Sequence, residues 1–432
     1  MRSDSLSTAA FALGGTTPLQ PPAAERAPRE EVLITAPRVI PAAAGPEILE
    51  PGYVAVRAGV VTAVAPGPPP REPDLELPAG TLLPGFVDLQ VNGYFGVELM
   101  AAGADGWATV ATRLPETGTT AFLPTFITAP PGALGTALRA AAALIPALPQ
   151  RAARVLGVHA EGPFISPARR GAHNEAWITD PSPAAVDDLL EAGQGVLRLV
   201  TLAPERDGAP AAITRLTQAG VLVSVGHSDA TARQVADAAS RGARMVTHLF
   251  NAQRPLHHRE PGVVGQALTD PRLTCGLVTD MRHVAAQVCL LAFAAAPGRI
   301  CAVTDAAACA GMPPGRYVLG GEPIELPPGD GEPPVRADGT LAGSALRMDA
   351  AVANMVAAGI APAAAVAAAT RVPADLIGRP DLGRVAPGAA ADLAWLDDGL
   401  RTRATWIGGE LVYARTGGSE GGWGGGRGDW RP

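Results

Sequence analysis

The central part of the chain alternates short apolar runs with segments of helical composition. The runs centre on residues 86–90, 120–125, 155–159, 197–202, 221–226, 245–249, 274–279 and 300–304. Segments between them, such as PAAVDDLLEAGQG and TARQVADAASRGA, have the composition of helices. Strands that alternate with helices indicate βαβ units and a parallel sheet. Eight such units predict an α/β fold, a (β/α)8 TIM-like barrel, which we place at residues 85–383.

Shorter β patterns flank this region on both sides. EEVLITAPRVI, YVAVRAGVVTAVAP and TLLP precede it, and ADLAWLDD and RATWIGGELVYAR follow it. They predict a small β-sandwich-like domain built from both chain ends, residues 31–84 and 384–415. Residues 1–30 are rich in Ala, Pro, Ser and Thr and predict a disordered extension. Residues 416–432 predict a flexible Gly-rich tail.

The composition of the chain excludes several classes of partner and active site. The net charge of -7 does not indicate a nucleic-acid or anionic-membrane partner. The chain has no lysine, so its 34 basic residues are all arginine. This excludes a Walker phosphate loop, a Schiff-base lysine and a carboxylated-lysine metal bridge. Four cysteines without a CxxC pair indicate reduced, structural thiols and a cytoplasmic protein. The Ala-rich residues 350–370 are interrupted by Asn354, Gly359 and Pro362, and predict two helices rather than a membrane span.

All seven histidines lie within residues 159–283, mostly where an apolar run ends. In a (β/α)8 barrel the catalytic residues lie at the carboxyl ends of the strands. Glu161, His227 and Asp305 follow the third, fifth and eighth runs, and His248 lies at the end of the sixth. Catalytic zinc takes three protein ligands and leaves one position for water. The first three residues are therefore candidate metal ligands, and Asp305 is a candidate general acid/base. A loop ion pair for Glu161 and a helix N-cap for Asp305 are the alternatives.

An ordered series of motifs extends over residues 31–415. It reads LPGFVDLQVNG, HAEGPFI with GAHN, VGHSDA, THLFNA, HREPG, VTDA and GTLAGSALRMD. The series resembles the N-acetylglucosamine-6-phosphate deacetylases of the amidohydrolase superfamily. The resemblance implies a divalent metal ion bound by Glu161, His227 and His248, with Asp305 as general acid/base.

The resemblance also implies roles for residues around the metal. His173 would help to polarise the acetamide carbonyl, and its alternative is a histidine that caps a turn. His283 would contact the substrate, and Asn251 and Ala252 would approach its phosphate through backbone N–H groups. Arg259 would bind the phosphate through its guanidinium fork, and its alternative is a solvated loop arginine. Some phosphate contacts come from a neighbouring subunit in the family, which implies a homodimer.

Two departures from the family pattern carry expectations. Gln90-Val91-Asn92 stands where many amidohydrolases have His-x-His for a second metal, so we expect one ion per subunit. Zinc suits the ligand set best, and Fe2+, Co2+ and Mn2+ are chemically possible. Gln253 replaces the usual Met after THLFNA, and we expect it to alter the pocket wall.

His159 is expected to be a buried partner of the site rather than a ligand. We expect His257 and His258 to be loop histidines near the phosphate entrance.

The leading hypothesis is a deacetylase that converts N-acetylglucosamine 6-phosphate to glucosamine 6-phosphate and acetate by attack of a metal-activated water. A second hypothesis is another amidohydrolase, acting on a cyclic amide or a different N-acyl amino sugar. A third is a non-catalytic barrel that binds a sugar phosphate.

Overall fold

A parallel β-barrel forms the larger body of the computed structural model, which describes residues 31–43, 47–329 and 331–415. The predictions for residues 1–30 and 416–432 lie outside these residues. The barrel strands are β7 (Phe86–Val91), β10 (Thr119–Ile127), β12 (Val158–Glu161), β13 (Leu197–Leu202), β14 (Leu222–Val225), β15 (Met245–Val246), β16 (Thr274–Leu277) and β17 (Ile300–Ala302). Each pairs in parallel with the next, and β11 (Arg154–Val155) also pairs with β10. Each of the eight predicted runs overlaps one of these strands, so the predicted barrel is confirmed.

The first and last barrel strands meet beyond the end of β17. The backbone N–H of Asp305 donates to the carbonyl of Gln90 at 2.9 Å, and Val91 and Ala306 form a parallel bridge. Asp88, fully buried in β7, accepts a 2.6 Å hydrogen bond from the Thr304 hydroxyl. Backbone hydrogen bonds and a side-chain hydrogen bond therefore join the first and last strands and close the barrel at this point.

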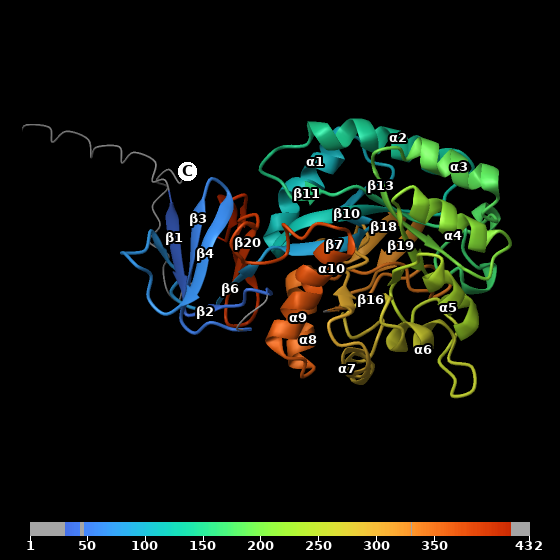
Figure 1. Ribbon diagram of the computed structural model, residues 1–432. Coiled ribbons are helices and arrows are strands. Elements are labelled where there is room, and N and C mark those ends of the chain that lie inside the picture. The colour runs from blue at the N-terminus through green and yellow to red at the C-terminus, as the bar shows by residue number, and fades with distance from the viewer. Residues whose placement is uncertain (1–30, 44–46, 330, 416–432) are drawn as a thin grey trace, which may run out of the picture.

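Helices cover the outside of the barrel (Figure 1). Those of the barrel region are α1 (Ala104–Arg113), α2 (Ala133–Leu144), α3 (Pro183–Ala192), α4 (Ala209–Gln218), α5 (Ala232–Ser240), α6 (Gly262–Thr269), α7 (Ala286–Ala295), α8 (Met348–Ala357), α9 (Pro362–Ala369) and α10 (Arg371–Leu376). Short 3-10 helices occur at Leu114–Thr117, Ile145–Ala147, Pro167–Arg169 and Glu175–Trp177. The segments predicted as helices contain α3 and α5, and the Ala-rich stretch contains α9 and most of α8.

Local sequence explains where these helices begin and which face they bury. At the start of α5 the Thr231 hydroxyl accepts from the Gln234 backbone N–H, and the Gln234 side chain accepts in return from the Thr231 backbone N–H. This reciprocal pair satisfies two N–H groups that the first helical turn leaves free. Val235, Ala238 and Ala239 then recur at helical spacing and are buried. None of the described helices is both long and apolar enough to cross a membrane.

A β-sandwich lies beside the barrel and joins the two ends of the described chain (Figure 1). One sheet contains β1 (Val32–Ala36), β3 (Gly52–Arg57), β4 (Val60–Pro66) and β5 (Leu75–Glu76). The other contains β2 (Arg38–Val39), β6 (Thr81–Pro84), β20 (Leu393–Leu396), β21 (Thr402–Ile407) and β22 (Glu410–Ala414). Side chains from both sheets, including Ile34 and Val54 of the first and Leu82 and Trp406 of the second, form a hydrophobic core of their own. The predicted fold class, a barrel with a small β-domain from both ends, is therefore confirmed.

Two antiparallel hairpins lie near the carboxyl ends of the barrel strands. One is β8 (Gly93–Tyr94) with β9 (Val97–Glu98), directly after the first barrel strand. The other is β18 (Gly315–Leu319) with β19 (Glu322–Leu326), after the last barrel strand. The second hairpin packs on Ile127 at the end of β10, and the sequence analysis did not predict it.

Candidate metal centre

Three side chains from the carboxyl ends of three strands meet at one point. Glu161 is the last residue of β12, and His227 and His248 each follow their strand by two residues. The Nε2 atom of His248 lies 3.0 Å from Glu161 Oε1 and 3.0 Å from His227 Nε2, and His227 Nε2 lies 3.1 Å from Glu161 Oε1. All three residues are at least nine-tenths buried. The structure therefore brings the three predicted ligands together.

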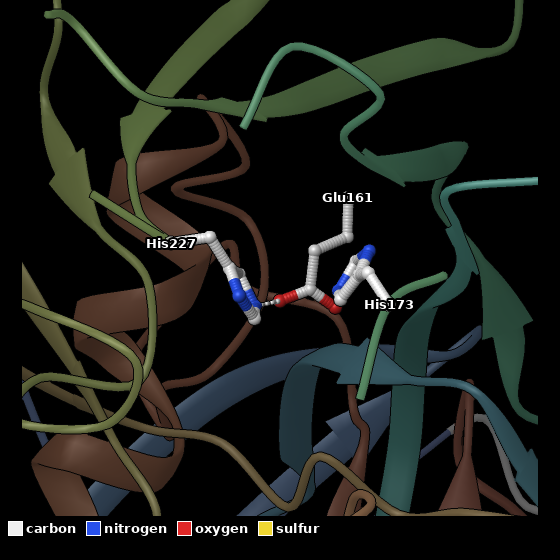
Figure 2. Close-up of side chains that lie close together, drawn as sticks. All are labelled: Glu161, His173 and His227. Atoms are coloured by element: carbon white, nitrogen blue, oxygen red, sulfur yellow. Dashed lines mark hydrogen bonds and ion pairs between the residues drawn. The ribbon is translucent and has the colours of Figure 1, made fainter. Parts of the chain in front are cut away.

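His173 joins the same cluster from the loop that follows β12. Ligand atoms of Glu161, His173 and His227 lie within 4.8 Å of one another. Figure 2 shows the Glu161 carboxylate between the imidazoles of His227 and His173. This part of the structure is thus a candidate metal site with one carboxylate and several imidazoles.

Hydrogen bonds behind the cluster fix the orientation of two imidazoles. His227 Nδ1 lies 3.0 Å from the Arg169 carbonyl oxygen, which can only accept, so Nδ1 carries the proton and Nε2 offers a lone pair to the site. His173 has the opposite arrangement. Its Nδ1 lies 2.8 Å from the Thr128 hydroxyl and accepts from the Thr128 backbone N–H at 3.4 Å. An accepting Nδ1 leaves the proton of neutral His173 on Nε2.

The backbone is unusual at the site. His227, His248 and Asp305 have φ angles of 48°, 28° and 52°, a region that residues other than glycine rarely adopt. Each such residue costs about 1–3 kcal/mol, and such residues cluster at functional sites. Packing of the surrounding barrel must therefore hold these three turns in place.

Burial and mutual attraction act against each other in this cluster. Burial disfavours the charge of Glu161, but the close contacts of its carboxylate with the imidazoles of His227 and His248 outweigh this effect and hold the pKa of Glu161 well below its usual value. Burial likewise disfavours a charged His248, but the Glu161 carboxylate raises the pKa of His248 above its usual value. For His173 burial dominates, and it lowers the pKa well below the usual value. The centre thus has an anionic Glu161 and a neutral His173.

Asp305 lies beside the cluster, held by two amides from the first strand. Its Oδ1 accepts from Asn92 Nδ2 at 2.8 Å and from Gln90 Nε2 at 3.0 Å, and Gln90 Nε2 also lies 3.3 Å from Glu161 Oε1. Burial, together with the charge of Glu161, raises the pKa of Asp305 to about 6. No described helix begins at Asp305, so the helix N-cap alternative is wrong. The loop ion-pair alternative for Glu161 is also wrong, because its carboxylate contacts the two histidines.

A cavity of about 210 Å³ opens from the cluster. It is lined by the candidate site residues Glu161, His173, His227, His248, Asn251, Ala252, His283 and Asp305. His283 is oriented by Asp280, whose Oδ2 lies 2.6 Å from His283 Nδ1. Arg259 is the one candidate that does not line this cavity in the described chain. It is exposed, and its guanidinium contacts the neighbouring His258.

The contacts of His159 and Gln253 decide the two expectations made for these residues. His159 is buried under the site, between the hydroxyls of Thr125 and Thr201, at 3.2 and 2.7 Å. Burial lowers its pKa to about 4, so its interpretation as a buried partner agrees with the structure. The expectation that Gln253 alters the pocket wall is wrong. Its amide turns inward, donates to the Thr247 carbonyl at 2.8 Å and accepts from the Phe250 backbone N–H at 3.1 Å.

Several cavity residues were missed by the sequence analysis. Thr340, Leu341 and Gly343 lie in GTLAGSALRMD, which was recognised as a motif but assigned no contact. Ile127 and Leu319 also line the cavity. None of these side chains can bind a metal or transfer a proton near neutral pH, so residue chemistry alone gave no signal for them.

The barrel and its buried cluster of carboxylates and imidazoles define a metal-dependent hydrolase site at the carboxyl ends of parallel strands. The family model described as the amidohydrolase family matches residues 81–312 and 333–412. The chain belongs to the amidohydrolase family, whose members use a divalent metal.

Named relatives are similar over most of their length. The N-acetylgalactosamine-6-phosphate deacetylase of Escherichia coli O157:H7 is 39% identical over 371 residues, which cover 84% of this chain and 95% of the relative. The N-acetylglucosamine-6-phosphate deacetylase of Homo sapiens is 41% identical over 352 residues, which cover 77% of this chain and 83% of the relative.

A solved structure agrees with this similarity. It is a mutant of the N-acetyl-D-glucosamine-6-phosphate deacetylase of Mycobacterium smegmatis in complex with N-acetyl-D-glucosamine-6-phosphate. Its TM-score is 0.83 at 36% identity, and the match covers 89% of this chain and 100% of that chain. An enamidase structure, 14% identical with a TM-score of 0.57, shares the fold.

Proposed function

We propose that the protein is a metal-dependent deacetylase that hydrolyses N-acetylglucosamine 6-phosphate to glucosamine 6-phosphate and acetate. The observation that carries the proposal is the meeting of Glu161, His227, His248, His173 and Asp305 at one cavity. This cluster of side chains occurs in a chain that is 36–41% identical to proteins named as deacetylases of this substrate.

Glu161, His227 and His248 are the proposed ligands of a single ion. Bonds of 2.0–2.1 Å in a tetrahedral site place ligand atoms about 3.3 Å apart, close to the observed 3.0–3.1 Å. The lone pair of His227 Nε2 faces the cluster and can bind the ion. His173 presents an N–H group there and is better suited to donate a hydrogen bond than to bind a metal. A divalent ion at this position would supply a nucleophilic water near neutral pH and polarise a carbonyl oxygen. We propose Zn2+, with Fe2+, Co2+ or Mn2+ as alternatives.

Gln90 and Asn92 support the proposal of one ion per subunit. They occupy the positions where a second ion would need imidazole ligands, and their amide groups donate to Asp305 instead. The N–H groups that face Asp305 cannot bind a cation, and neither side chain has the imidazole nitrogen that a second ion would use there.

The side chains around the cavity have different proposed roles in hydrolysis. His173 Nε2–H donates a hydrogen bond to the acetamide oxygen and stabilises the negative charge that develops there. Asp305, through the oxygen not held by the two amides, accepts the proton of the attacking water. It then returns this proton to the sugar nitrogen as the C–N bond breaks. His283, fixed by Asp280, orients the sugar.

Arg259 is proposed to bind the substrate phosphate from a neighbouring subunit. It lies in the loop between β15 and α6, which projects from the barrel (yellow, Figure 1), and it is exposed. Asn251 and Ala252 line the cavity of their own subunit and are proposed to approach the phosphate. The proposal therefore includes a homodimer whose loops exchange between subunits. His257 and His258, exposed in the same loop, lie where they could assist Arg259.

A second candidate substrate is N-acetylgalactosamine 6-phosphate, because a relative covered over 95% of its length is named for that activity. We also propose a cytoplasmic location, supported by four buried, free cysteines.

Acetate release tests the proposal. The two phosphorylated sugars and unphosphorylated N-acetylglucosamine are compared, with and without a chelator, followed by addition of Zn2+. We expect turnover of N-acetylglucosamine 6-phosphate that is lost on chelation and restored by the metal. Absence of acetate release by the metal-loaded protein would contradict the proposed function. Faster release from the galactosamine derivative would favour the second candidate.

A further inference from the structure

The β18–β19 hairpin covers one side of the cavity and lies outside the general family pattern. The family match stops at residue 312 and resumes at residue 333, and the hairpin occupies the interval between them. Its strands alternate, with Leu319, Ile324 and Leu326 buried and Arg316 and Val318 exposed. The buried face packs on Ile127, Ala172 and neighbouring residues in a small core of its own.

The turn of the hairpin is held against the barrel by specific contacts. The Gly320 backbone N–H donates to the Glu98 carboxylate, and Asn174 Nδ2 donates to Glu322 Oε1 at 3.1 Å. Gly320 has a φ of +62°, and a Cβ atom there would lie 2.4 Å from Ile127 Cδ1. The turn therefore sits directly on Ile127, with no space between them for a side chain.

Leu319 and Ile127 form an apolar wall next to His173. Both line the cavity, and both are at least nine-tenths buried. Ala172, in the same apolar cluster, precedes His173 in the chain, and Thr128, which holds His173 Nδ1, follows Ile127. The position where a carbonyl oxygen would meet His173 is thus bordered by hydrocarbon.

We propose that Leu319, together with Ile127, determines the length of the acyl group that the enzyme removes. The inference rests on the proposed function. When the amide oxygen lies at His173, the group attached to the carbonyl carbon extends along this wall, where a methyl group replaces water at no polar cost. A longer acyl chain would have to displace Leu319, which the anchored turn holds in place. The wall therefore favours acetyl over propionyl and butyryl groups.

The test measures kcat/KM of the Zn2+-loaded protein for N-acetyl-, N-propionyl- and N-butyrylglucosamine 6-phosphate. One methylene in an apolar pocket changes specificity by about tenfold or more. We expect Leu319→Ala to raise the ratio of butyryl to acetyl kcat/KM by at least about tenfold relative to the wild type. Leu319→Val removes less volume and is easier for the hairpin to accommodate. It should raise the ratio of propionyl to acetyl kcat/KM relative to the wild type.

Val318→Ala is the matched control, because Val318 lies in the same strand and is 43% exposed. It should leave the acyl ratios unchanged. Ratios that stay at the wild-type value in both Leu319 variants would overturn the proposed wall, even where acetyl turnover falls. A wild-type protein that releases no acid from any of the three substrates would instead overturn the proposed function, and the inference with it.

Discussion

The two amides that hold Asp305 can be tested by removing one donor. Asn92 Nδ2 donates to Asp305 Oδ1 at 2.8 Å, inside a buried site. Asn92→Leu keeps a similar side-chain volume but removes this donor. A hydrogen bond to a charged group is worth about 1.5–3 kcal/mol, and 1.36 kcal/mol corresponds to one pKa unit. Because the lost bond stabilises the ionised form, the pKa of Asp305 should rise by about one to two units.

The sign of this change decides the expected pH profile. Asp305 must be ionised to accept a proton, so kcat/KM falls on the acidic side as the carboxylate becomes protonated. In Asn92→Leu this acidic limb should move to higher pH by about one to two units, while activity at alkaline pH changes less. The measurement is acetate release from N-acetylglucosamine 6-phosphate across the acidic and neutral range. Comparing two proteins with the same bound metal removes the effect of the ion on the absolute pKa.

A second amide provides the control. Asn354 in α8 donates from Nδ2 to the Thr279 carbonyl at 3.0 Å and does not line the cavity of the described chain. Asn354→Leu removes a comparable hydrogen bond and should leave the acidic limb in place. If Asn92→Leu lowers kcat/KM by the same factor at every pH, the assignment of Asn92 as a partner of ionised Asp305 is refuted.

Three further results are expected. Asp305→Asn should retain metal and substrate but lose about 10²–10⁴-fold in turnover, checked by metal analysis, substrate binding and acetate release; near-normal turnover would refute its role. Arg259→Ala should impair phosphorylated substrates far more than N-acetylglucosamine itself, and mixing it with Asp305→Asn chains should restore part of the activity if Arg259 acts across a dimer; equal losses for both substrates would contradict phosphate binding. Burial raises the pKa of Asp88 from 3.8 to about 7, so the folded protein keeps a proton between these values that the unfolded chain releases. Its contribution to stability therefore falls as pH rises through that window, by up to about 1.4 kcal/mol per pH unit. Denaturant titrations should show a flatter pH dependence for Asp88→Asn, and an unchanged slope would count against a protonated Asp88.

The sequence predicted the barrel because strands buried on both faces appear as continuous apolar runs. Runs such as residues 197–202 are mostly apolar, and polar residues at the ends of other runs marked Glu161, His227 and His248. The predicted ligands therefore depended on two strong signals, strand position and ligand chemistry. The domain boundaries, in contrast, remain predictions.

The parts that could not be predicted depend on contacts between distant segments. Leu319 lies in a five-residue strand in which buried and exposed side chains alternate. The sequence does not show that the buried side packs on Ile127, which is distant in the chain. Gln253 was expected to alter the pocket wall because it replaces the usual Met, but two hydrogen bonds to its own loop turn it inward. Arg259 has the right chemistry for phosphate, yet no sequence pattern reports that its side chain is exposed and does not line the cavity.

The closure of the barrel has a consequence for how activity and folding are linked. Asp305 sits at the junction between the first and last strands, which Gln90, Asn92 and Asp88 bridge. The proton-transferring group is therefore assembled by the same bonds that complete the ring. A change that opens this junction should therefore displace Asp305 from Gln90 and Asn92, even where the imidazoles stay in place.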